Sequence, residues 1–226
     1  MSAAPTSALP GRLAPTNLLE FAPFATTGLR IFVIHNRDIL SSAAFQSLLA
    51  EIRTAYDAHM RALLAAPTGA GRARVFHQRM DAEMESASQW KPSCRKGCSG
   101  CCHCEVEVTM DEADLLAEAV RDGLEVDRTR LSRQAARPRK SPEWVVPLSP
   151  ESRCVFLGDD GACRVYERRP SACRKLLVVS PPVACVTIGA QTSPIQVPRA
   201  EILLSAALAI AGSGITSIAK ALVARL

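Results

Sequence analysis

Cysteine is the residue type in this sequence best suited to chemistry, and five of its nine copies lie within eleven residues, at positions 94, 98, 101, 102 and 104. Two thiols separated by two or three residues can converge on one ion, because a tight turn brings their sulfur atoms within a few ångströms. Tetrahedral zinc sites and iron–sulfur clusters are built in this way. The remaining four cysteines, at 154, 163, 173 and 185, follow in the C-terminal half. The spacing therefore predicts a metal site.

The composition is typical of a globular protein, with 226 residues, 48% hydrophobic and 22% charged side chains. The net charge of +5 permits contact with an acidic partner but does not require nucleic acid. Residues 1–23 contain one basic side chain and no continuous apolar run, so they lack the regions of a secretory signal. We therefore expect a cytoplasmic location, where clustered cysteines typically bind metal rather than form disulfides.

The first part of the chain is predicted to hold a weakly structured tail followed by two helices. Prolines interrupt residues 1–37, where only Ile31–Ile34 could form a short strand. Residues 41–90 are predicted to form a helical hairpin. Apolar side chains recur at helical spacing over Ser41–Ala65 and again over Arg72–Ala87, and the short connection between them favours antiparallel neighbours.

A cysteine core is predicted over residues 94–185. Its first regular element is a short strand over Cys104–Thr109, where apolar and polar side chains alternate. Thr109 and Glu112 then have the spacing of a capping box, in which the two side chains satisfy the first free amides of a helix. We therefore expect a helix to begin directly after this strand.

Further short elements are expected in the second half of the cysteine core. Two strands, Cys154–Leu157 and Cys163–Tyr166, flank a turn rich in glycine and aspartate. This hairpin would hold its two cysteines near one another. Pro170 can begin a helical turn, and Leu176–Val179 and Val183–Ile188 are two more candidate strands.

The C-terminal part, residues 198–226, is predicted to be helical. Ile202–Ala219 contains no charged residue, but its many small side chains favour a buried helix pair, divided near Gly212 and Gly214, over a membrane span. A dimer interface is a minor alternative for this segment. Residues 38–226 together would form a single domain of the α+β class, mostly helical. In this fold the helical hairpin and the C-terminal helices surround a small metal-clamped region with short β-strands.

The complete cysteine pattern resembles a known family. The pattern runs Cys94-x3-Cys98-x2-Cys101-Cys102, then Cys154-x-Phe-Leu, then Cys163-x-Val-Tyr-x2-Arg169-Pro170-x2-Cys173-Arg174. It resembles the YkgJ-type cysteine-cluster family, which is described as a zinc- or iron-chelating domain. The resemblance implies that the metal ligands are Cys94, Cys98, Cys101, Cys102, Cys154, Cys163 and Cys173. Cys104 and Cys185 fall outside the pattern.

Seven thiolates exceed the four that one zinc ion or one four-iron cluster needs. The surplus indicates either two zinc ions that share a bridging thiolate or one iron–sulfur cluster with spare thiols, and we favour the cluster. His103 could add a ligand, although its position beside Cys102 favours an outward orientation. Arg169 and Arg174 could neutralise a thiolate centre or could form ordinary salt bridges and helix caps.

The leading functional hypothesis is a metal-binding protein that chelates iron, as an iron–sulfur cluster, or Zn²⁺. One alternative is an enzyme that uses the cluster for redox or methyl-transfer chemistry, because flagellin lysine methylases carry a similar cysteine cluster. No glycine-rich strand-to-helix loop for a nucleotide-like cofactor is present, which counts against methyl transfer. The spacing also matches radical S-adenosylmethionine enzymes, but the chain lacks the repeated βα units of their barrel. No catalytic residue is identified, so we lean toward a protein that is not an enzyme.

The remaining alternative is an interaction module with a purely structural zinc site. Arg128–Lys140 carries six basic residues and no acidic one. This segment could meet an acidic protein partner, although a solvated helix or loop is the default interpretation. We expect no nucleic acid, because no aromatic side chain interleaves with the basic ones to stack on bases.

Overall fold

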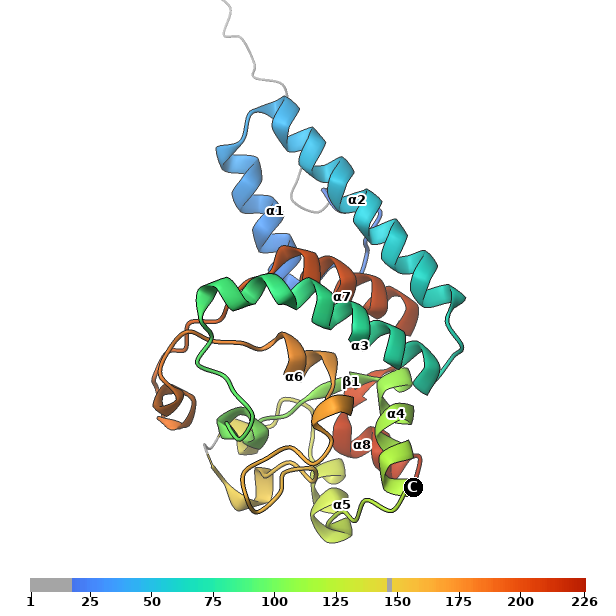
Figure 1. Cartoon of the computed structure of the whole chain (residues 1–226), viewed down its shortest axis with the longest axis vertical. Coiled ribbons are helices and arrows are strands. Elements are labelled where there is room, and N and C mark those ends of the chain that lie inside the picture. Colours follow the sequence, from blue (N-terminus) through green and yellow to red (C-terminus); the bar gives the residue numbers. More distant parts are fainter. Residues whose placement is uncertain (1–17, 146–147) are drawn as a thin grey trace, which may run out of the picture.

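The computed structural model describes residues 18–145 and 148–226 and places helices around a small two-stranded sheet (Figure 1). Helices α1, α2, α3 and α7 form the upper part of the view, and α4, α5, α6, α8 and the strands lie below α3. Within the described residues, six short 3-10 helices connect these elements: η1 (Glu85–Trp90), η2 (Gly100–His103), η3 (Pro142–Val145), η4 (Pro150–Ser152), η5 (Tyr166–Arg168) and η6 (Pro182–Val186). The prediction of a mostly helical α+β fold is confirmed.

Helix α1 (Thr27–Ile39) corrects the prediction of weak structure up to residue 37 and of a strand over residues 31–34. Thr26 caps this helix, and Leu29 and Val33 lie four residues apart on its buried face, against α7. Contact with the rest of the fold therefore stabilises a segment whose neighbouring prolines suggested a tail. The part of that prediction that concerns residues 1–17 lies outside the described residues.

The two predicted helices of the hairpin are present as α2 (Ser42–Ala65) and α3 (Ala70–Met84). They diverge from their connection, and α7 (Pro198–Ala211) packs against both of them (Figure 1). One apolar cluster runs through this layer and includes Ile52, Met80 and Leu203. The hairpin is thus closed by a helix from the far end of the chain rather than by direct packing of α2 on α3 alone.

The lower layer is built around a strand pair that joins distant parts of the chain. Strand β1 (Glu107–Thr109) pairs antiparallel with β2 (Ile215–Ser217). The sequence predicted β1, although over a longer range, but placed a helix where β2 lies. Helix α4 (Met110–Arg121) follows β1 with the predicted capping box complete, and α8 (Ile218–Val223) follows β2.

A second apolar cluster fills the space between α4, α8 and α5 (Arg128–Ala136). Leu116, Leu131, Phe156 and Leu222 are among its most buried members. Phe156 lies between Cys154 and Cys163, so this cluster also supports the cysteine core.

The strands predicted in the cysteine core are only partly present. The turn after Leu157 closes through one antiparallel bridge between Leu157 and Cys163, with Arg164 N donating to Phe156 O over 2.8 Å. Of the two further candidate strands, Leu176–Val179 makes only one bridge, from Val178 to Pro194. Val183–Ile188 was wrong, because η6 occupies most of that range. Pro181, which caps η6, and Pro182, its first residue, cannot donate to a strand ladder and favour a helical turn.

No helix among residues 18–145 and 148–226 combines the length and the apolar character that crossing a bilayer requires.

Candidate metal centre

One cavity of about 120 Å³ is lined by all seven cysteines that the resemblance implied as ligands. They are Cys94, Cys98, Cys101, Cys102, Cys154, Cys163 and Cys173. The first four come from the loop before η2 and from η2 itself. The next two flank the segment that contributes Phe156 to the second apolar cluster, and Cys173 lies on α6 (Ser171–Lys175). The structure therefore brings together thiols from three segments that are far apart in the sequence.

Backbone hydrogen bonds hold these segments in place. Cys154 N donates to Cys102 O over 2.7 Å, which joins the two cysteine groups directly. Ser93 N donates to Val178 O over 2.8 Å and fixes the start of the cysteine loop to the segment after α6. The positions of the thiols are thus set by main-chain contacts and not only by side-chain packing.

The donors share a cavity without forming a compact metal cage. Within residues 18–145 and 148–226, no group of three or more histidine, cysteine, aspartate or glutamate side chains is arranged to hold a metal ion. All nine cysteines are free thiols. Binding of one ion by several of them would therefore require side chains to turn toward a common centre.

The cavity walls disfavour charged thiolates in the absence of a cation. Burial raises the pKa of Cys94 and Cys163, and it raises the pKa of Cys154 to about 11. A hydrogen bond with Cys102, followed by burial, raises the pKa of Cys101. Thiols of this kind are protonated at neutral pH, so a metal ion would have to displace their protons.

Arg169 places a positive charge at this cavity. Its side chain lines the cavity, and its guanidinium lies over the Tyr166 ring at 4.1 Å from the ring centroid. Its charge favours the thiolate forms of Cys94 and Cys163. The sequence left open whether Arg169 and Arg174 neutralise thiolates or form ordinary salt bridges. Arg169 is positioned to neutralise thiolates.

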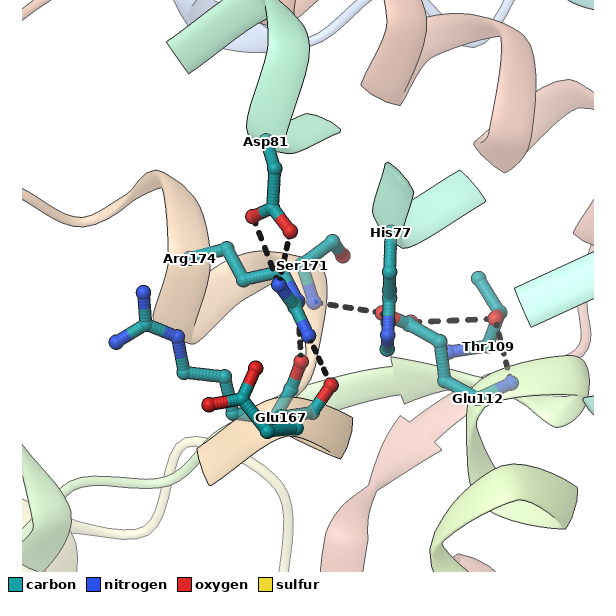
Figure 2. Close-up of polar contacts among 8 residues, drawn as sticks. His77, Asp81, Thr109, Glu112, Glu167, Ser171 and Arg174 are labelled. Atoms are coloured by element: carbon teal, nitrogen blue, oxygen red, sulfur yellow. Dashed lines mark hydrogen bonds and ion pairs between the residues drawn. The ribbon is translucent and has the colours of Figure 1, made fainter. Parts of the chain in front are cut away.

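Arg174 has the other role, because it does not line the cavity and forms an ion pair with Asp81 (Figure 2). Its Nη1 donates to Asp81 of α3 over 2.7 Å, and its Nε donates to Arg169 O over 2.8 Å. It also donates to Glu167 O. Arg174 thus connects the turn that contains Arg169 with the long helix α3.

A buried carboxylate, Glu112, contacts the start of α6 and was predicted only as a helix cap (Figure 2). It accepts hydrogen bonds from Thr109 N over 3.0 Å and from Ser171 N over 2.7 Å, and it lies 3.0 Å from Nε2 of the buried His77. Burial raises the pKa of Glu112, but the His77 contact and the backbone donors outweigh burial and hold its pKa below the ordinary value. The capping-box spacing identified Glu112, whereas nothing local could reveal the other two partners.

Three residues near the cysteine loop do not line the cavity: His103, Cys104 and Cys185. His103 is buried, contrary to the expectation of an outward orientation, and its Nδ1 lies 3.3 Å from Ser99 O. Cys104 is exposed. Cys185 packs closely on Gly100, where an added β-carbon would lie 2.9 Å from its own.

Residues 93–189 match the family model CxxCxxCC, described as "Putative zinc- or iron-chelating domain". This match contains all seven cavity cysteines and confirms the resemblance that their spacing suggested. It supports metal chelation by this part of the chain and does not distinguish zinc from iron. No curated protein and no solved structure matches the chain.

Proposed function

Because residues 93–189 match a zinc- or iron-chelating family, we propose that this chain binds iron, as an iron–sulfur cluster, or zinc through cysteine thiolates. The proposed ligands are drawn from Cys94, Cys98, Cys101, Cys102, Cys154, Cys163 and Cys173. The observation that carries this proposal is the convergence of all seven thiols on one cavity. An all-sulfur donor set is the set that zinc and iron–sulfur clusters share.

The size of the cavity supports an occupant larger than one four-coordinate ion. A cavity needs roughly 10 to 15 Å³ to hold one water molecule, whereas this cavity measures about 120 Å³. A single zinc ion would use four thiolates and leave three unused. Two zinc ions with a shared thiolate account better for both the space and the number of thiols. An iron–sulfur cluster accounts better for the space, although it also leaves thiols unused.

The chain's own residues would orient the thiols and limit the access of water. Apolar side chains such as Val106, Phe156 and Ile218 line the cavity with the thiols. When bound, the metal would supply cross-links between the thiol-bearing segments and, if it is an iron–sulfur cluster, a centre that can exchange electrons. A cytoplasmic, reducing location would keep the thiols available for the metal.

The experiment that tests this function is metal and sulfide analysis of the full chain purified without oxygen. Brown protein with acid-labile sulfide would identify an iron–sulfur cluster, and colourless protein with stoichiometric zinc would identify zinc. Folded protein that contains no metal, and that takes up none when iron with sulfide or zinc is supplied, would contradict the proposal.

The basic segment gives weaker support to the alternative of an interaction module. Arg133 lies 3.2 Å from a carboxylate of Glu151, and Arg137 lies 2.9 Å from a carboxylate of Glu143. Arg139 forms an ion pair with Glu107 as well. These charges already have partners within the chain, so an acidic protein would have to compete for them.

A further inference from the structure

Arg169 lines the cavity, and no ion pair among the described residues explains why its side chain is held there. Among the described residues, no carboxylate lies within ion-pair distance of its guanidinium, although the other arginine of the same motif, Arg174, pairs with Asp81. Its Nε is buried and has no hydrogen-bond partner. A buried donor without a partner is costly, so this atom indicates a missing acceptor or a missing negative charge.

The chain holds Arg169 in place from two sides. The Tyr166 ring lies against the guanidinium at 4.1 Å, which is the geometry of a cation–π contact. The carbonyl oxygen of Arg169 accepts from Arg174 Nε over 2.8 Å, and Arg174 is itself fixed to α3 through Asp81. The positive charge is therefore oriented before any ligand binds.

We propose that Arg169 is the built-in counter-charge of the metal–thiolate centre, a positioning residue that stabilises a net anionic occupant of the cavity. This inference rests on the proposed metal-binding function. Four thiolates around one zinc ion, or around a four-iron cluster, carry a net negative charge. Arg169 lines the same cavity as the thiols, and an opposite charge in a weakly polar cavity acts more strongly than it does in water.

Arg168 provides a matched control for this role. It is the adjacent residue and has the same side chain, but it pairs with Asp122 over 3.1 Å and does not line the cavity. Loss of one positive charge from the protein as a whole is the same in both variants. A difference between them therefore reports the position of the charge.

The test compares the wild type with Arg169→Gln, Arg169→Lys and Arg168→Gln as full-length, metal-free chains titrated with Co²⁺. The sulfur-to-cobalt absorption reports thiolate binding. We expect Arg169→Gln to weaken Co²⁺ binding by about tenfold or more, as is usual for a lost group beside the ligands, and to raise the pH of half-loading. Arg169→Lys should recover part of the loss, and Arg168→Gln should match the wild type.

Equal affinities and equal pH midpoints for Arg169→Gln and the wild type would overturn the inference. So would equal losses in Arg169→Gln and Arg168→Gln. Circular dichroism and thermal melting of the metal-free variants establish whether the chain folds. If Arg169→Gln does not fold, Arg169→Lys decides. A Co²⁺ affinity below those of the wild type and Arg168→Gln would sustain the role of Arg169, and an affinity and pH midpoint equal to both would overturn it. A folded wild type that binds neither Co²⁺ nor iron with sulfide would instead contradict the proposed function itself.

Discussion

The backbone N–H of Ser171 donates to the Glu112 carboxylate over 2.7 Å and joins residues that lie 59 positions apart (Figure 2). Ser171 begins α6, the short helix that carries Cys173. Glu112 is the third residue of α4 and caps the start of that helix. One buried carboxylate therefore sets the position of a cavity thiol relative to α4 and, through His77, relative to α3.

Glu112→Gln is expected to lower the free energy of unfolding by about 3 kcal/mol, because it removes one partner of a buried, hydrogen-bonded pair. Denaturant unfolding of the metal-free chain measures this value. Glu118→Gln is the control, since Glu118 lies on the same helix and pairs with Arg74 at the surface. The control should cost less than about 0.5 kcal/mol. Equal effects of the two substitutions would contradict a central role for Glu112.

The stabilisation from Glu112 should also depend on pH. Its pKa is lower in the folded chain than the ordinary value of 4.5, so the unfolded chain takes up this proton first as the pH falls. The contribution is therefore complete above about pH 4.5 and is lost as the pH falls through the lower pKa of the folded state. Unfolding measured from pH 7 downward should show the wild type and Glu112→Gln converging in acid. A constant difference would show that the carboxylate charge is not responsible.

Cys98→Ser and Cys185→Ser should separate the cavity thiols from a thiol outside the cavity. Cys98 lines the cavity, whereas Cys185 packs on Gly100 beyond its wall. We expect Cys98→Ser to lose most of its metal and to become less stable in the metal-loaded form, and Cys185→Ser to retain its metal. Metal content and thermal melting measure both effects. Similar metal loss in the two variants would show that the ligand set extends to Cys185.

Local patterns in the sequence predicted those parts of the fold that depend on neighbouring residues. The apolar spacing of Ser42–Ala65 is helical whatever it packs against, and the capping box of Thr109 and Glu112 needs only its own turn. The spacing of the cysteines from 94 to 102 is a local pattern that indicates a metal site. The inclusion of Cys154, Cys163 and Cys173 was implied only by the resemblance to a known family, because no local pattern connects them to that loop.

Contacts between distant segments explain what the sequence did not reveal. Strand β2 forms because Ile215–Ser217 pairs with Glu107–Thr109, and nothing in either segment's sequence indicates that the other is its partner. His77 and Ser171 meet Glu112 from two separate helices, with no spacing rule that connects them. Helix α1 was missed for the same reason, since its buried face is defined by α7.

Removal of metal should loosen the cysteine core more than the upper helical layer. The proposed metal joins the cysteine loop, the turn after Cys154 and α6, whereas the buried face of α2 packs in a separate apolar cluster with α7. Hydrogen exchange of the loaded and the chelator-treated chain measures this difference. Amides such as those of Cys154 and Ser171 should exchange faster without metal, and the amide of Ile52 in α2 should change little, because local opening follows the loss of local contacts.

The same treatment of the Cys98→Ser variant is the control and should have little further effect. An equal loss of protection in both layers would show that the metal stabilises the whole chain as one cooperative unit and not the cysteine core.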